Sequence, residues 1–163
     1  LIHLSTGDIF RYNIKESTDL GVMAKEFMDK GELVPDEVTI KMLESEVNKH
    51  PKSSGFIFDG FPRTTLQAKA LDDFLSSKNL SITKMIALEV PNDELISRLF
   101  LRGKQSGRED DQDKSIIANR IKVYESQTAV LAEYYKAQNK LATVNGVGSV
   151  DQITERLYRS IDL

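Results

Sequence analysis

Residues 55–64, which read GFIFDGFPRT, hold the densest group of side chains that could do chemistry in this sequence. The apolar run at 56–58 predicts a strand that is buried on both faces. Asp59 ends the run with a carboxylate, Gly60 permits a turn or a close backbone approach, and Arg63 supplies a forked cation. A strand, a charged turn and a helix start in this order are typical of a ligand site at the carboxyl edge of an open α/β sheet. The alternative interpretation is an ordinary connection in which Asp59 and Arg63 form an ion pair.

Six arginines form a second candidate group, because each lies in a loop, beside a loop or on a helix face near one. They are Arg11, Arg63, Arg98, Arg102, Arg108 and Arg120. A guanidinium fork binds two phosphate oxygens at once, which a lysine ammonium does not do. Each arginine taken singly is better explained as a solvated group paired with a nearby carboxylate. Convergence of several of them on one site would indicate phosphate chemistry.

The remaining charged and polar patterns favour phosphoryl transfer over other reactions. Asp110 and Asp111 follow Arg108, and we expect them to pair with arginines rather than to hold a cation. His3 and His50 lie far apart in the sequence, which argues against a Ser-His-Asp triad or a histidine metal cluster. A site rich in arginine and poor in histidine suits transfer between phosphates, because an anionic acceptor needs no general base. Neither glycine-rich nucleotide motif, G-x-G-x-x-G or G-x-x-x-x-G-K-[ST], is found in the sequence.

Composition sets the outer limits of the interpretation. The chain has 163 residues, of which 40% are hydrophobic and 29% charged, as expected for one soluble globular domain. Its net charge of −3 gives no bulk electrostatic case for binding nucleic acid or an anionic membrane. There is no cysteine, so disulfides, cysteine catalysis and thiolate zinc sites are excluded, and a reducing cytosol is compatible. We expect neither a membrane span nor a signal peptide.

Strands and helices alternate along the chain, which predicts right-handed crossovers and a mostly parallel sheet. Four strands are expected, at residues 1–4, 56–58, 85–90 and 141–144. The strand at 85–90 is expected to be buried. A polar segment at 103–113 is expected to be a mobile loop, and one long helix is expected at about 114–138.

Capping residues mark the start of the other helices. Ser5 or Thr6 is expected to cap the first helix, and Asp19 a second helix that Gly31 ends. Pro35 suits the first position of a third helix. Thr64 or Thr65 is expected to cap a helix to residue 78, whose apolar face includes Leu66, Ala70, Leu71, Phe74 and Leu75. A helix follows Pro91, and a capping box at Ser149 and Gln152 opens the last helix.

Five segments taken together resemble adenylate kinase, a family of nucleoside monophosphate kinases. They are STGD at 5–8 with Arg11, LVPDE at 33–37, DGFPRT at 59–64 with Gln67, GR at 107–108 with Asp110 and Asp111, and the helix carrying Arg120 and Tyr124. The segments follow the family's order, and the match runs over residues 1–163. The DGFPRT segment is highly specific, whereas STGD alone would be a weak signal.

The resemblance implies an α/β, three-layer P-loop-type kinase fold with a parallel sheet in a single domain, residues 1–163. Residues 19–52 would form an AMP-binding helical lobe, and residues 103–113 a short lid without a zinc-type insertion. The implied activity is the interconversion of ATP and AMP with two ADP by direct phosphoryl transfer, which serves nucleotide homeostasis. The implied cofactor is Mg²⁺ with ATP and not zinc. The implied state is a cytoplasmic monomer without nucleic-acid or membrane partners.

The resemblance also implies roles for individual residues. The AMP-binding residues would be Thr6, Arg11, Val34, Gly60, Phe61, Pro62, Arg63, Gln67, Arg108 and Arg120. Among them, Thr6 and Gln67 would face the base. Arg11 and Arg63 would grip the phosphate.

The residues around the transferring phosphoryl group would be Arg63, Arg102, Arg108 and Arg120. The residues on the ATP side would be Arg98 against the adenine, Arg102, and Gly148 through its backbone. Asp59 would act on the magnesium ion through water.

The sequence departs from the family in one respect. The family begins with a strand, central in its sheet, and a phosphate loop ending in GKGT, and neither is found here. We therefore expect a copy without this strand and loop, with the 56–58 strand beside the missing one. The lack of the loop calls catalysis by this chain into question. One alternative is a UMP/CMP kinase, against which Thr6 and Thr64 argue. The other is a non-catalytic nucleotide-binding or interaction module.

Overall fold

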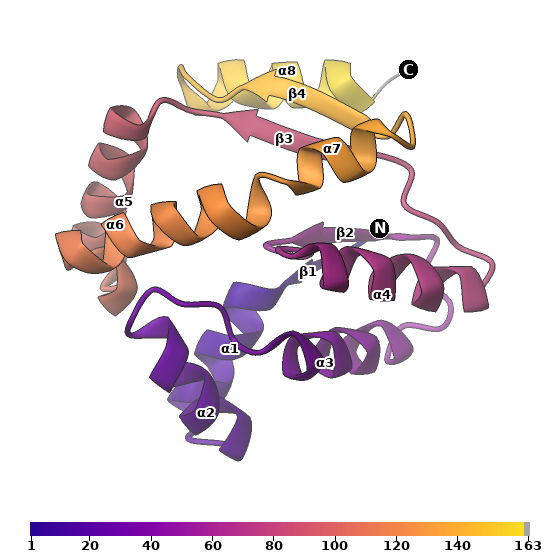
Figure 1. The fold of residues 1–163 in the computed structure, drawn as a ribbon, viewed down its shortest axis with the longest axis horizontal. Helices are drawn as coiled ribbons and strands as arrows, with labels where there is room; N and C mark the ends of the chain where they lie inside the picture. Colours follow the sequence, from indigo (N-terminus) through magenta and orange to yellow (C-terminus); the bar gives the residue numbers. More distant parts are fainter. Residues whose placement is uncertain (162–163) are drawn as a thin grey trace.

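Four strands form two separate parallel pairs in the computed structural model, which describes residues 1–161 (Figure 1). Strand β1 (Ile2–Ser5) pairs with β2 (Phe56–Asp59), and β3 (Met85–Glu89) pairs with β4 (Leu141–Asn145). In each pair the intervening chain returns through helices, as parallel pairing requires. The predicted parallel strands are therefore confirmed, although they do not form one sheet within residues 1–161.

Strands β2 and β3 are only partly covered. Ile57 on β2 is 50% exposed and Leu88 on β3 is 47% exposed. Successive strand residues point to opposite faces, and Phe56 and Phe58 are the β2 side chains that pack against the core. The predictions that 56–58 is buried on both faces and that 85–90 is buried are therefore wrong for residues 1–161.

Three helices separate β1 from β2 along the sequence. They are α1 (Thr6–Lys15), α2 (Asp19–Met28) and α3 (Asp36–Asn48). Ser5 caps α1 as expected, because its side chain accepts a hydrogen bond from the Asp8 N–H. Two predicted starts are wrong by one residue. Thr18, not Asp19, caps α2 by accepting from the Gly21 N–H at 3.0 Å. Pro35 is the cap residue of α3 rather than its first helical residue, and it makes no side-chain cap hydrogen bond.

The second half of the chain supplies the remaining helices. They are α4 (Thr65–Ser77), α5 (Asn92–Ser106), the 3₁₀ turn η1 (Glu109–Asp111), α6 (Lys114–Val123), the π-helical turn η2 (Tyr124–Thr128), α7 (Leu131–Lys136) and α8 (Val150–Ile161). Two boundaries differ from the prediction. Helix α5 continues to Ser106, so residues 103–106 are helical and only the rest of 103–113 forms a loop with one 3₁₀ turn. The predicted long helix is interrupted by η2 and by a turn at 129–130.

Hydrophobic clusters join these elements. The first cluster lies around β1, α3 and α4 and contains Leu4, Leu43, Val47, Phe61, Leu71 and Leu75. A second cluster joins α1, α2 and α3 through Phe10, Ala24, Val34 and Met42. A third joins α4 to α7 through Ala68, Leu131 and Tyr135. The α4–α7 contact connects the half of the molecule with β1–β2 to the half with β3–β4.

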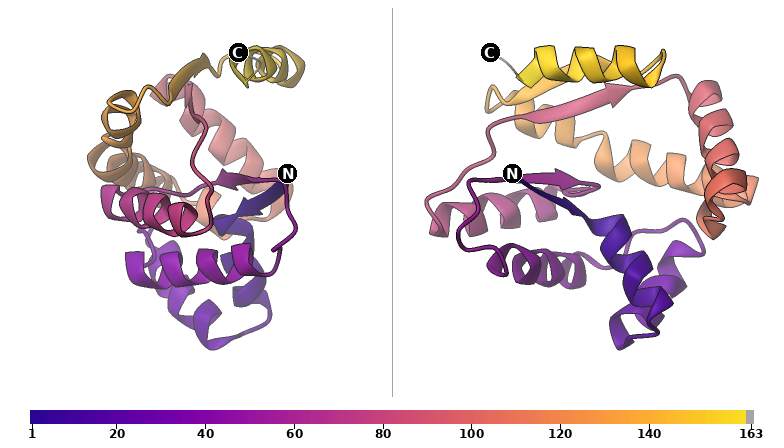
Figure 2. Two further views of the ribbon diagram at one scale, coloured as in Figure 1. Left: turned by 90° about the vertical axis from the view of Figure 1, so that its right-hand side faces the viewer. Right: turned by 180° about the vertical axis from the view of Figure 1, so that it is seen from behind.

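The arrangement places β1–β2 in the middle of the molecule. Helices α1 and α2 lie at one end, and β3–β4 with α8 at the other, as Figures 1 and 2 show. On α4, the predicted apolar face is correct for Leu71 and Leu75, which are buried. It is wrong for Leu66, which is 56% exposed.

These two α4 leucines give a matched test of the core. We expect Leu71→Ala to lower the free energy of unfolding by about 2–5 kcal/mol, because a nearly fully buried side chain is replaced by a cavity. We expect Leu66→Ala to lower it by less than about 1 kcal/mol, because that side chain is mostly in solvent. Urea unfolding followed by circular dichroism measures both, and equal losses would contradict this description of α4.

Candidate active site

The turn after β2 holds Arg63 close to the backbone. Gly60 has φ 71°, and a Cβ at this position would lie 3.0 Å from the Arg63 guanidinium and 3.2 Å from Thr6 Oγ1. Glycine therefore both permits the left-handed turn and leaves room for the arginine. Arg63 Nε and Thr6 Oγ1 both donate to the Gly60 carbonyl, at 2.8 Å and 3.0 Å. The Arg63 fork, Nη1 and Nη2, has no hydrogen-bond partner among residues 1–161.

Asp8 connects two further arginines. Its Oδ1 accepts a hydrogen bond from Arg11 Nη2 at 2.6 Å and lies 3.6 Å from Arg108 Nη2. Arg11 is one turn along α1 from the helix start, whereas Arg108 precedes η1, so Asp8 brings together segments that are far apart in the sequence. The hydrogen bond from Arg11, with the nearby Arg108 charge, lowers the pKa of Asp8.

Asp111 connects the other two arginines and is fully buried. Its Oδ2 accepts from Arg102 Nε and its Oδ1 from Arg120 Nη1, both at 2.5 Å. Asp110 adds a second contact to Arg120 at 3.0 Å. Burial acts to raise the pKa of Asp111, but the hydrogen bond and charge of Arg102 and the charge of Arg120 outweigh it and lower that pKa. The predicted pairing of Asp110 and Asp111 with arginines is therefore confirmed.

Electrostatics indicate that these side chains form one cluster. Burial, followed by the positive charge of Arg120, lowers the pKa of Arg63. Burial, followed by the charges of Arg11 and Arg102, lowers the pKa of Arg108. We call Arg11, Arg63, Arg102, Arg108 and Arg120 the arginine cluster. Such a group of forked cations, in which Arg63 has no ion-pair partner among residues 1–161, is suited to a ligand with several anionic oxygens.

Gly31, which follows α2, lets α6 pack closely against the backbone there, and this contact positions Arg120. It has φ 71°, and a Cβ there would lie 2.7 Å from the Ile116 carbonyl oxygen and 2.9 Å from Arg120 Cγ. Asn119 Nδ2 donates to the Lys30 carbonyl at 2.7 Å beside it. The sequence predicted Gly31 only as a helix end, and its second role follows from the docking of α6.

Of the other predicted AMP-binding residues, Gln67 and Thr6 contact the turn after β2, whereas Val34 packs among α1, α2 and α3. Gln67 is buried, with its amide bonded to Asp36 and to the Arg63 N–H. Phe61 and Val34 are buried in hydrophobic clusters, so their side chains support the fold. The Thr6 hydroxyl already donates to the Gly60 carbonyl.

Arg98 and the Gly148 loop form a separate group at the end of β4. Arg98 Nε donates to Glu94 at 2.7 Å, and its Nη1 to the Gly146 carbonyl at 2.8 Å. Arg156 on α8 donates to the carbonyls of Asn145 and Val147, so it fixes the same loop. A hollow of about 430 Å³ lies beside it, lined by Glu89, Val90, Pro91, Asn145 and Val147. Sequence reasoning missed Arg156, because its partners are backbone carbonyls that no side-chain pattern reveals.

Asp59 stands at the carboxyl end of β2. Its Oδ2 lies 3.3 Å from His3 Nε2 on the neighbouring strand, and both side chains are largely exposed. Within residues 1–161 there is no group of three or more His, Cys, Asp or Glu side chains that could hold a metal. A single exposed carboxylate fits magnesium, which is usually bound by one or two carboxylates together with substrate phosphates and water.

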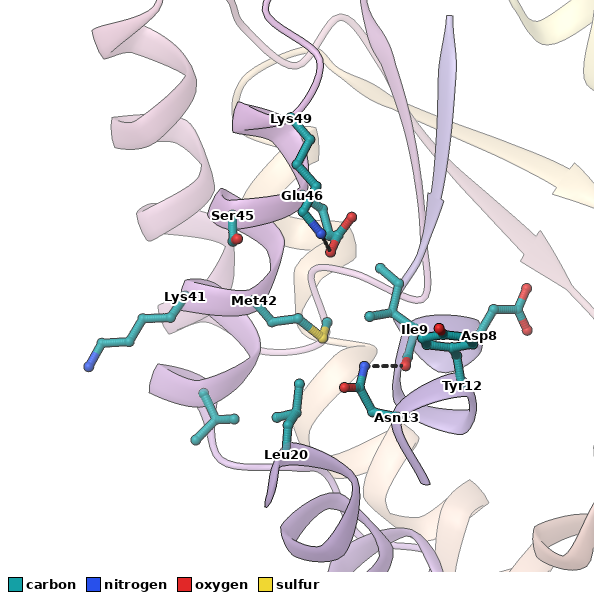
Figure 3. A pocket seen from close by; sticks show the side chains of 11 residues that line it. Asp8, Ile9, Tyr12, Asn13, Leu20, Lys41, Met42, Ser45, Glu46 and Lys49 are labelled. Carbon is teal, nitrogen blue, oxygen red and sulfur yellow. Dashed lines mark hydrogen bonds and ion pairs between the residues drawn. The ribbon is translucent and has the colours of Figure 1, made fainter. Parts of the chain in front are cut away.

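A hollow among the first three helices does not coincide with the arginine cluster. It measures about 820 Å³ and lies among α1, α2 and α3, where Figure 3 shows its lining. The polar side chains along it are partly engaged: Asn13 donates to the Ile9 carbonyl, and Lys49 pairs with Glu46. Of the three carboxylates that pair with the arginine cluster, Asp8, Asp110 and Asp111, Asp8 alone lines this hollow. None of the residues predicted from the sequence as site residues lines this hollow.

Comparison with known proteins identifies the family. The adenylate kinase family profile matches residues 1–140. Adenylate kinase from Flavobacterium psychrophilum is 59% identical over 162 residues, which are 99% of this chain and 85% of that protein. Adenylate kinase from Flavobacterium johnsoniae is 57% identical with the same coverage, and that from Bacteroides fragilis is 44% identical over 160 residues, 98% of this chain and 84% of the relative.

These matches confirm the family, the α/β kinase fold class and the assignment as a nucleotide-binding transferase. No helix within residues 1–161 has the length and apolar character needed to cross a membrane. The arginine cluster, the DGFPRT turn and relatives matched over nearly the whole chain lead to one conclusion. The chain belongs to the adenylate kinase family of phosphotransferase enzymes.

Proposed function

We propose that the arginine cluster binds the phosphates of ATP and AMP and promotes direct phosphoryl transfer between them to give two ADP. The observation that carries this proposal is the convergence of five arginines, from α1, the β2 turn, α5, the loop before η1, and α6. Only three carboxylates, those of Asp8, Asp110 and Asp111, pair with the cluster among residues 1–161. The site therefore favours a polyanionic ligand.

On the AMP side, Arg11 and Arg63 bind the phosphate of AMP. The other AMP-binding residues are Thr6, Val34, Gly60, Phe61, Pro62 and Gln67, with Arg108 and Arg120 above the phosphate. Support comes from the β2 turn, where Arg63 is partly buried and its fork has no hydrogen-bond partner among residues 1–161. A buried donor that is already in position needs no reorganisation as charge develops on the phosphoryl group.

Around the transferring group, Arg102, Arg108 and Arg120 join Arg63. Negative charge is spread over the equatorial oxygens in the transition state, and positioned guanidinium groups stabilise it. The acceptor is an anionic phosphate oxygen, so no general base is required. On the ATP side, Arg98 lies against the adenine and the Gly148 backbone borders the base. Their common attachment to the loop after β4 supports this placement.

Asp59 is the residue that would hold Mg²⁺, through a water molecule. When bound, the ion would offset part of the negative charge of the ATP phosphates. Asp59 itself contributes a largely exposed carboxylate, close to His3, at the end of β2 where the DGFPRT segment begins. We infer no zinc requirement.

Residues 19–52 and 103–113 act as the AMP lobe and the short lid of a single domain, closing over the nucleotides. One contact between the two segments supports this proposal: Glu109 pairs with Lys25 on α2 at 3.1 Å. The lid segment also approaches α1, where Arg108 lies 3.6 Å from Asp8. Closure would exclude water from the phosphoryl group. We further propose a cytoplasmic monomer that needs no nucleic-acid or membrane partner.

The ATP phosphates need a donor loop that the described residues do not supply. Strands β2 and β3 each have one strand partner within residues 1–161, so one edge of each is free. We propose that a strand with a glycine-rich phosphate loop completes the sheet there, with β2 beside it. A non-catalytic nucleotide-binding chain is the second candidate, because the 163 residues contain no G-x-x-x-x-G-K-[ST] motif.

The rate of turnover by these 163 residues tests whether phosphoryl transfer needs the proposed phosphate loop. We expect AMP binding but very slow ATP-dependent conversion of AMP, measured in a coupled ADP assay with AMP, UMP and CMP as acceptors. Robust turnover would show that the expected loop is dispensable. Preference for UMP or CMP would instead favour the pyrimidine kinase alternative.

Arg63→Ala tests the phosphate site. We expect a 10- to 100-fold weaker AMP affinity by calorimetry, because a hydrogen-bonded charge contact contributes about 1.5–3 kcal/mol. Arg159→Ala is the matched control, since Arg159 is an exposed arginine on α8 whose one ion-pair partner among residues 1–161 is Glu155. Unchanged AMP affinity in Arg63→Ala would refute the assignment.

Asp111→Asn tests how the cluster is held together. At pH 7 we expect a loss of about 1–3 kcal/mol in the free energy of unfolding, below the cost at a fully buried pair because both arginines are partly exposed. The pKa of Asp111 is lowered in the folded protein, so its contribution is present above the unfolded pKa of about 3.9 and is lost as the pH falls through the lower folded value.

Urea titrations between pH 7 and pH 3 measure this pH dependence. The difference between the wild type and Asp111→Asn is expected to be constant near neutrality and to shrink below about pH 4. Asp93→Asn, at an exposed position early in α5, is expected to change stability by less than about 0.5 kcal/mol. A difference that grows in acid would contradict the assigned pairing.

A further inference from the structure

Gln67 is a buried amide held from two sides. Its side chain is 2% exposed. Nε2 donates to Asp36 Oδ1 at 2.7 Å, and Oε1 accepts from the Arg63 backbone N–H at 2.8 Å. The amide therefore lies between a carboxylate on one helix and the turn that carries the phosphate-binding arginine.

Asp36 reaches this amide from a different element. It is the first residue of α3, whereas Gln67 lies in the first turn of α4. The same Asp36 oxygen also accepts from Thr64 Oγ1 at 3.1 Å, and Thr64 caps α4 by accepting from the Gln67 N–H at 3.2 Å. Asp36 thus joins the starts of two helices, where a negative charge is favourable.

The two partners dictate which way the amide faces. A carboxylate only accepts hydrogen bonds and a backbone N–H only donates them, so Nε2 must face Asp36 and Oε1 must face Arg63. Turning the amide over would set oxygen against oxygen and N–H against N–H in a buried place. Each hydrogen bond lost there leaves a group unsatisfied, at a cost of about 1–3 kcal/mol.

The fixed amide keeps unused capacity. An amide group offers two N–H donors and two acceptor positions, and residues 1–161 use one of each. One donor and one acceptor therefore remain for a ligand that presents an acceptor beside a donor. Adenine has this pattern at N1 and its 6-amino group. Hypoxanthine has the opposite pattern, with an N1–H donor beside a 6-oxo acceptor.

We propose that Asp36 is a positioning residue that determines base specificity, by holding the Gln67 amide in the orientation that accepts adenine and rejects hypoxanthine. The inference rests on the proposed AMP site. With the phosphate held by Arg11 and Arg63, the base of IMP has no freedom to turn over and restore the pairing. A site built to hydrogen-bond one pattern discriminates strongly against its inverse, because buried polar groups are left unpaired.

Calorimetry with AMP and IMP tests this role. We expect the wild type to prefer AMP by at least about 30-fold, and Asp36→Ala to reduce the ratio of IMP to AMP dissociation constants about tenfold, equivalent to 1.4 kcal/mol. The reduction is partial because the Arg63 N–H still acts on the amide. Glu37→Ala is the matched control: it removes a neighbouring, exposed carboxylate from the same helix start and should leave the ratio unchanged.

Folding of each variant is checked by circular dichroism and thermal unfolding. If Asp36→Ala does not fold, Asp36→Ser decides, because its hydroxyl both donates and accepts and no longer dictates the orientation. We expect its ratio to fall at least threefold. Weaker AMP binding with an unchanged ratio in a folded variant would show a purely structural role and overturn the inference. A wild type that binds AMP and IMP equally would also overturn it, whereas a wild type that binds neither refutes the proposed AMP site itself.

Discussion

Repulsion among the arginines of the cluster is the constraint on which the rest of this structure depends. Burial and the charge of Arg120 lower the pKa of Arg63, and burial and the charges of Arg11 and Arg102 lower the pKa of Arg108. Carboxylates placed between the arginines offset this repulsion. Asp111 does this from full burial, and Asp8 does it across two segments of the chain. The positions of η1 and α6 relative to α1 therefore depend on the ion pairs between these carboxylates and the arginine cluster.

The turn after β2 connects the arginine cluster to the β1–β2 strand pair. Gly60 takes a left-handed conformation that leaves room for Arg63, and the Gly60 carbonyl ties both Arg63 and Thr6 to the end of the strand. Gln67 then connects the turn to α3 through Asp36. The proposed phosphate contact and the proposed base contact thus lie on one short segment, which would favour precise placement of both ends of a nucleotide.

Much of the local structure follows from short-range chemistry and was predictable. Ser5, Thr64 and the Ser149–Gln152 box cap helices as expected, because a cap is satisfied within three residues. Predicted helix boundaries were wrong where two adjacent residues could both act as the cap, or where tertiary packing determined where the helix ends. Thr18 rather than Asp19 caps α2, and α5 runs past Gly103 because that glycine packs directly against the Asp111 backbone, at 2.5 Å from where a Cβ would lie. The π-helical turn after α6 has no local signal that we can identify.

The sequence by itself determined the family, the parallel strands, the order of the motifs and the identity of the arginines. It did so because those signals lie in contiguous segments or in the spacing of residue types. Only the tertiary structure decided which carboxylates face the arginines, that Gln67 is buried against Asp36, and that Ile57 and Leu88 stay half exposed. These outcomes depend on distances between residues that are remote along the chain. Such distances are set by helix docking and by the sheet edges, and no local pattern encodes them.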